Sequence, residues 1–153
     1  MATHITSTGV SFEAHGGSSV NLLDDYEEGS YTVTCQNSVT LYAASNLASY
    51  TKIGRMLTTG AQNRINNDNS DAVLLVNLPL TSSAGDGDSS GYYTGCPRLN
   101  EFNLNSDVMY VILYVNPNTS YFEVNAVRDD LGSTAVLADA SAYIMWSLTY
   151  AVA

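Results

Sequence analysis

The side chains in this 153-residue chain that could do chemistry are mostly carboxylates, gathered in two short stretches. These carboxylates are Asp24, Asp25, Glu27 and Glu28 in the first stretch, and Asp86 and Asp88 in the second. Paired carboxylates can hydrolyse glycosidic bonds, and clustered carboxylates can bind calcium. Both stretches have the composition of loops, however, and neither has the regular ligand spacing of an EF-hand. We therefore interpret them as solvated acidic turns and expect no enzymatic activity.

The only histidines, His4 and His15, both lie near the N-terminus in a segment of low hydrophobicity. A nucleophile–histidine–acid triad needs a base held rigidly within hydrogen-bond reach, which such a segment does not provide. Zinc needs more histidine or cysteine than this chain can bring together, and no glycine-rich loop precedes a helix to hold phosphate. We expect neither a metal site nor a cofactor.

The charge balance excludes two classes of partner. The chain has 5 Lys and Arg against 15 Asp and Glu, for a formal net charge of −10. Nucleic acids and anionic membrane surfaces both attract basic proteins, so neither is an expected partner. No stretch approaches the ~18 apolar residues of a membrane-spanning helix. Cys35 and Cys96 could form one bridge or remain two buried thiols, and the lack of a signal peptide favours free thiols.

Tyrosine is the most informative residue type, with 11 copies. Tyr92 and Tyr93 follow a flexible loop at 82–91, and with Asp86 and Asp88 they form a candidate receptor loop. Three other tyrosines lie in strand-like segments: Tyr110, Tyr114 and Tyr121. Exposed tyrosines suit glycan or protein recognition, whereas tyrosines at a sheet rim are ordinary packing. The sequence leaves both interpretations open.

Alternation of apolar and polar residues with a period of two predicts an all-β domain. The predicted strands cover residues 31–35, 39–43, 48–53, 55–64, 72–78, 92–96, 108–115, 121–128 and 141–152. Gly60 is a candidate bulge in its strand, and 108–115 is apolar on both faces, which predicts a central position. Residues 31–153 are therefore predicted to form a β-sandwich, and residues 1–30 an extended N-terminal arm with a short strand at 5–12.

Three segments resemble elements of phage virion proteins, particularly fibre and decoration proteins of marine and cyanobacterial phages. Residues 23–32 read LDDYEEGSYT and resemble the LDDYEEGTxTP element of those proteins. Residues 50–55 resemble their YTKIG element, and residues 78–83 their LPFTSS element, in the same order. The resemblance implies a jelly-roll-like sandwich that trimerises and lies on the outer surface of a phage particle.

The acidic element also defines a predicted partner-binding segment that would anchor the arm to the sandwich. Its apolar members are Phe12, Leu23 and Tyr26, and its acidic members are Asp24, Asp25, Glu27 and Glu28. The apolar residues would contact the sandwich, and the acidic ones would face solvent or a basic partner. Gly29 would let the chain turn into the first strand.

Two functions are compatible with this sequence. The first is a homotrimeric capsid decoration protein, whose arm clamps the major capsid protein and stabilises the shell through many weak contacts. The second is the receptor-binding head of a short tail fibre that recognises a host surface glycan. The small size and the absence of shaft repeats favour decoration. A polysaccharide depolymerase has no support beyond the scattered carboxylates.

Overall fold

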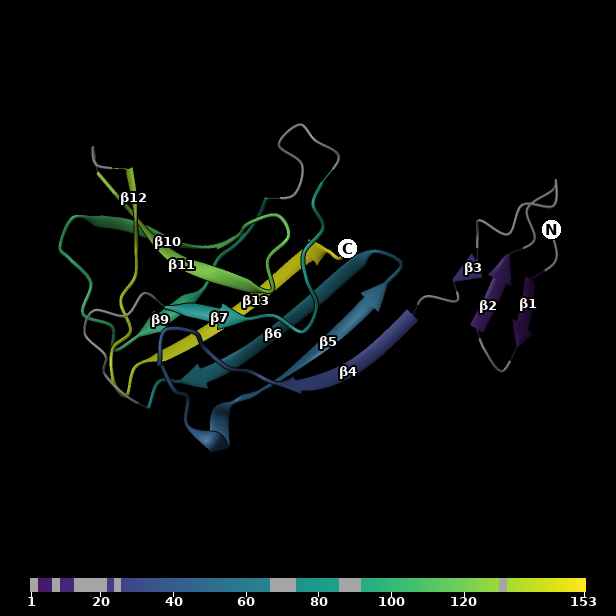
Figure 1. The fold of residues 1–153 in the computed structure, drawn as a ribbon, viewed down its shortest axis with the longest axis horizontal. Helices are drawn as coiled ribbons and strands as arrows, with labels where there is room; N and C mark the ends of the chain where they lie inside the picture. Colours follow the sequence, from purple (N-terminus) through teal and green to yellow (C-terminus); the bar gives the residue numbers. More distant parts are fainter. Residues whose placement is uncertain are drawn as a thin grey trace.

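The protein, described here by a computed structural model, is built almost entirely from antiparallel strands (Figure 1). The structure describes residues 26–66, 74–85, 92–129 and 132–153, and the backbone of 3–6, 9–12 and 22–23. Two five-stranded sheets form the main body, which confirms the predicted all-β class. A third sheet of three short strands lies apart from them, beyond the start of β4 in Figure 1.

The first large sheet has the strand order β4-β5-β6-β13-β9. Its strands are β4 (Tyr26–Thr32), β5 (Leu47–Ile53), β6 (Met56–Arg64), β13 (Tyr143–Ala151) and β9 (Arg98–Asn100). The β5–β6 connection is a tight turn in which Gly54 has a φ of 57°, a conformation that glycine adopts without steric cost. The last strand of the chain therefore lies inside the sheet, paired along its whole length with β6.

The second large sheet has the order β12-β11-β10-β8, and β7 also pairs with β11. Its strands are β7 (Leu75–Asn77), β8 (Tyr93–Gly95), β10 (Val108–Val115), β11 (Tyr121–Arg128) and β12 (Gly132–Ala135). The predicted central position of 108–115 is confirmed, because β10 has a paired strand on each side. The predicted hairpin to β11 is also present, with Asn118 at a φ of 57° in its turn.

The two sheets enclose a single hydrophobic core. Phe122 of β11 contacts Trp146 of β13 with ring centroids 4.8 Å apart, so the aromatic contact joins one sheet to the other. Tyr93 of β8 meets Tyr150 of β13 edge-on at 6.3 Å. As predicted for the last strand, one complete face of it is buried: Ile144, Trp146, Leu148, Tyr150 and Val152.

Polar groups inside this core are hydrogen-bonded. The Trp146 indole N–H donates to Asn63 Oδ1 at 2.8 Å, and Asn63 Nδ2 donates to the Ser45 carbonyl at 2.7 Å. The Tyr150 hydroxyl donates to the Leu80 carbonyl at 2.9 Å. A buried donor or acceptor without a partner costs more than the bond itself contributes, so these bonds specify how the core residues pair.

Three sequence-based details are wrong. Residues 5–12 do not form one strand, because β1 (Thr3–Thr6) and β2 (Gly9–Phe12) pair antiparallel with each other. Residues 39–43 form no strand, because the chain makes one bridge at Leu41 and then enters a short 3-10 helix, Ala43–Ser45. Gly60 is not a bulge: the β6–β13 pairing runs through it unbroken.

Gly60 is instead required for a close approach between strands. A Cβ atom at this position would lie 2.7 Å from the Trp146 carbonyl oxygen, which is backbone and cannot swing away.

The segment predicted as arm also differs in detail, because β4 begins at Tyr26 and crosses residue 30 without a break. The third strand of the small N-terminal sheet, β3 (Leu22–Leu23), pairs with β2 shortly before β4 begins.

Candidate functional site

The outer faces of the two large sheets differ sharply in chemistry. In the second sheet, Tyr110, Ile112 and Tyr114 of β10 point away from the core. Their cross-strand partners in β11 are Val127, Asn125 and Glu123, which share the same face. We call this outer surface of β10 and β11, together with Tyr92 next to β8, the tyrosine face.

Tyr92 and Tyr114 lie together at one end of the tyrosine face. Their rings are stacked with centroids 5.6 Å apart and an interplanar angle of 24°. Tyr92 keeps 50% of its surface exposed, and Tyr110, further along β10, keeps 56%. The neighbouring residue Tyr93 points the opposite way, into the core, so only the first of the two adjacent tyrosines is available to a partner.

A polar pair completes this surface. Asn116 Nδ2 donates to Glu123 Oε1 at 3.1 Å across the β10–β11 hairpin. Partial burial is the main cause that raises the pKa of Tyr114, and electrostatic repulsion from the nearby Tyr92 and Glu123 raises it further. The Tyr114 hydroxyl therefore stays protonated at neutral pH and can donate a hydrogen bond to a ligand.

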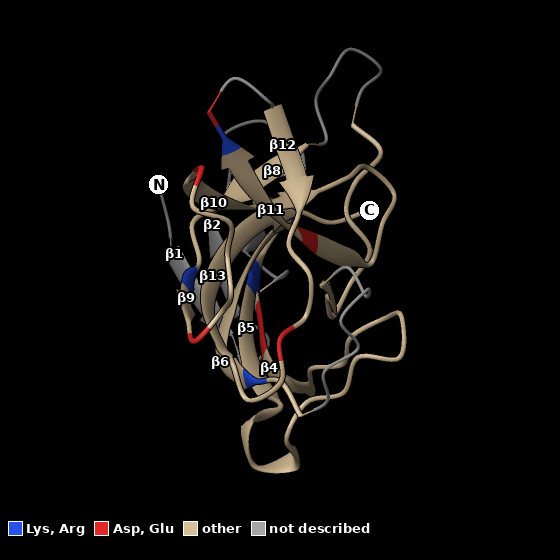
Figure 2. Cartoon of the chain, turned by 90° about the vertical axis from the view of Figure 1, so that its left-hand side faces the viewer, with Lys and Arg blue, Asp and Glu red and all other residues tan. Residues whose placement is uncertain are grey.

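The outer face of the first sheet carries two rows of small side chains, bordered by a row of the exposed residues Tyr26, Ile53 and Met56. One row across the strands consists of Ser30, Ser49, Gly60 and Ser147, each paired with the next. The adjacent row consists of Glu28, Thr51, Thr58 and Thr149, in which the last two hydroxyls are 2.9 Å apart. We call the surface made by these two rows the small-residue face. Figure 2 shows how sparsely charged residues occur over both sheets.

The structure describes two of the four predicted acidic anchor residues, Glu27 and Glu28, and it separates them. Glu27 and Glu28 are consecutive in β4 and so point to opposite faces of the sheet. Each accepts a hydrogen bond from a tyrosine hydroxyl, Glu27 from Tyr50 and Glu28 from Tyr26. The hydrogen bond to Glu28 is the main reason that the pKa of Tyr26 is raised. Because the two carboxylates do not converge, β4 holds no pair that could bind calcium together.

Several predicted site residues fall outside what the structure describes. Asp24, Asp25, Asp86 and Asp88 all lie outside the described residues. Phe12 ends β2 and Leu23 ends β3, where the backbone alone is described. Among described residues, no group of three or more histidine, cysteine or acidic side chains could hold a metal ion. In the same residues, no helix is both long enough and apolar enough to span a membrane.

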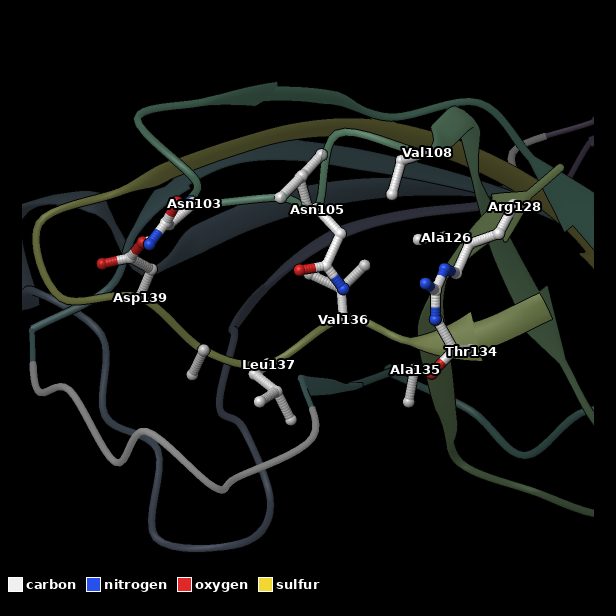
Figure 3. Close-up of a pocket in the computed structure, with 12 residues that line it drawn as sticks. Asn103, Asn105, Val108, Ala126, Arg128, Thr134, Ala135, Val136, Leu137 and Asp139 are labelled. Carbon is white, nitrogen blue, oxygen red and sulfur yellow. The ribbon is translucent and has the colours of Figure 1, made fainter. Parts of the chain in front are cut away.

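A pocket of about 420 Å³ opens beside β11 and β12 (Figure 3). Arg128 lies at one end of it, and Asn103 and Asp139 lie at the other, with Val136 between them. The charged groups here already have partners. Arg128 pairs with Asp107 through its Nε at 2.6 Å, which lowers the pKa of Asp107, and Asp139 accepts from the Asn103 N–H at 2.9 Å. The Arg128 charge is thus balanced by Asp107, and one Asp139 oxygen holds the Asn103 backbone.

Both cysteines are free thiols, as the sequence favoured, but the expectation that both are buried is wrong for Cys96. Burial raises the pKa of the Cys35 thiol to about 12, whereas Cys96 is exposed.

The Asn116–Glu123 pair is the feature that sequence reasoning missed. Its signal was the turn at 116–118, which brings the two ends of the hairpin together.

Comparison with known proteins adds no assignment. The chain matches no protein-family model, no curated protein and no solved structure.

Proposed function

We propose that this chain is a non-enzymatic virion protein: a homotrimeric capsid decoration protein with a jelly-roll-like sandwich, which reinforces the outer shell of a phage particle. Three sequence segments that resemble virion proteins support this, in the order LDDYEEG, YTKIG and LPLTSS. The net charge of −10 is consistent with a position outside the space filled by DNA.

The small-residue face is the observation that carries the proposal. Its two rows are Ser, Thr and Gly except for Glu28 at one edge, so its centre holds no charge. Short side chains lose little conformational entropy when they are buried, and they let a second sheet approach closely. In the proposed trimer this face would pack against a different surface of the next copy, because the contacts in a three-fold ring are heterologous.

The N-terminal segment supports the capsid contact. The sheet of β1, β2 and β3 lies apart from the sandwich, and its main pairings are internal (Figure 1). In the proposed assembly this small sheet, with the acidic segment that follows it, contacts the major capsid protein. Contacts repeated over a shell are strengthened by multivalency even when each one is weak.

The solution mass of the purified protein tests the assembly surface. Light scattering is expected to give the mass of a trimer for the native chain. Ser147→Arg places a charge in the centre of the small-residue face and is expected to give monomers. Thr94→Arg places the same charge on an exposed position of the other sheet and is expected to remain trimeric. A monomeric native protein would contradict the proposal, as would a trimeric Ser147→Arg.

The tyrosine face favours a second candidate function, the receptor-binding head of a short tail fibre. Tyr92, half-exposed and stacked on the partly buried Tyr114, provides contact area that costs little conformational entropy to order. Binding of the purified protein to host cells would favour this function. Loss of heat stability in capsids that lack the protein would favour decoration.

A further inference from the structure

We infer that the tyrosine face binds a neutral oligosaccharide, which lies along β10 across Tyr92, Tyr114 and Tyr110. This inference goes beyond the capsid function, because it assigns a ligand to a face that the proposed assembly leaves open.

The spacing of the rings indicates an extended ligand. Tyr110 and Tyr114 lie on the same side of β10, four residues apart, which corresponds to about 13 Å along a strand. Ile112 lies between them on the same face, so the surface from one ring to the other is continuous. The C–H groups of a sugar ring are attracted to the negative face of an aromatic ring. A single sugar would cover one tyrosine, whereas an oligosaccharide would contact both.

Hydrogen-bonding groups lie next to the rings. The Glu123 carboxylate, fixed at 3.1 Å by Asn116, can accept bonds from sugar hydroxyls. Asn125 is the next outward-facing residue of β11 after Glu123 and lies opposite Ile112. Its side-chain amide can both donate and accept hydrogen bonds. The face therefore offers aromatic rings for stacking and fixed polar groups for hydrogen bonds side by side.

The charge of the face selects among sugars. Glu123 is the only charged residue among the outward-facing positions of β10 and β11, and the chain as a whole has a net charge of −10. Glu123 and the net negative charge would repel a sulfated or sialylated glycan, and no described Lys or Arg on the outward side of these two strands offsets this repulsion.

Titration calorimetry with defined oligosaccharides tests the inference. The probes are maltohexaose, cellohexaose and mannohexaose as neutral chains, with heparin and sialyllactose as anionic ones. At least one neutral chain is expected to bind the native protein, and neither anionic probe is expected to bind. Failure of all three neutral chains, or tighter binding of an anionic probe, would overturn the inference.

Matched variants locate the site. Tyr114→Ala is expected to weaken binding about tenfold, the loss of one stacking contact. Tyr26→Ala removes a tyrosine that is 54% exposed on the other sheet and is expected to leave binding unchanged. Tyr92→Ala provides the same test if Tyr114→Ala does not fold. Equal losses in Tyr26→Ala and Tyr114→Ala would overturn the location.

The test also separates this site from the assembly surface. Monomeric Ser147→Arg is expected to bind the neutral chain as the native protein does. If Tyr114→Ala or Tyr92→Ala instead converts trimers to monomers, the tyrosine face is a contact between copies, and the oligosaccharide site is wrong.

Discussion

Tyr92 stacks on Tyr114 although the two residues are separated by 22 positions in the chain, because β8 and β10 are hydrogen-bonded neighbours. Val115 pairs with Tyr93. Tyr114 and Tyr92, which precede these two residues in the chain, therefore both point to the outer face. The stacked pair is therefore a product of strand register, and it lies on the surface opposite the core contact between Tyr93 and Tyr150.

The first prediction concerns a buried polar contact between β6 and β13, which are neighbouring strands of the first sheet. Asn63→Ala removes the acceptor of the Trp146 indole N–H and the donor to the Ser45 carbonyl. A buried donor left without a partner costs about 1–3 kcal/mol, so the free energy of unfolding is expected to fall by that amount. Urea denaturation measures it. Gln62→Ala, on the exposed face of the same strand, is expected to stay within about 0.5 kcal/mol of the native value.

The second prediction concerns the closest approach of two strands. Gly60→Ala places a methyl group 2.7 Å from the Trp146 carbonyl oxygen, so β6 or β13 must shift. Overpacking of this kind costs about 1–3 kcal/mol. Thermal unfolding measures the loss, and Ser147→Ala, which shortens the paired residue, is the control that should stay near the native stability. A native melting temperature for Gly60→Ala would show that the strands are further apart.

The third prediction concerns the two thiols. Burial raises the pKa of Cys35 to about 12, so little thiolate forms at neutral pH, whereas Cys96 is exposed. Only the thiolate reacts, so a thiol reagent is expected to modify Cys96 quickly and Cys35 slowly. The Cys96→Ser variant isolates the slow site, and unfolding in urea should make it fast. Equal rates in the folded protein would contradict the burial of Cys35.

The fourth prediction is a loss of stability at alkaline pH. Burial raises the pKa of Cys35 from 9.0 and that of Tyr31 from 10.0, each to about 12. Both groups ionise first in the unfolded chain, so their contribution is complete below pH 9 and is lost as the pH rises towards 12. Urea midpoints across this range measure the decline. Tyr31→Phe should flatten it above pH 10, and an unchanged slope would contradict the assignment.

The sequence predicted those parts of the fold that depend on local periodicity. Alternation in 143–151 identified the buried face of β13, and the apolar run at 108–115 identified a central strand. Gly60 was misinterpreted because a bulge and a close strand approach leave the same signal in a sequence, a lone glycine within a strand. Residues 39–43 alternate like a strand, but they make one bridge and then turn.

The candidate site was predicted only in part, for a similar reason. Tyr92 was recognised as available to a partner, yet its contact with Tyr114 depends on the pairing of β8 with β10, which no local pattern encodes. Asn116 and Glu123 come together only through the hairpin register. Residues separated in sequence and joined by register are the part that a single sequence does not reveal.

The copy number of this chain per phage particle, relative to the major capsid protein, tests the central proposal most directly. Quantitative mass spectrometry of purified particles is expected to give a copy number of the same order as that of the major capsid protein, as a decoration protein requires. A few trimers per particle would contradict decoration and support the receptor-binding head. Complete absence from purified particles would contradict a virion protein of either kind.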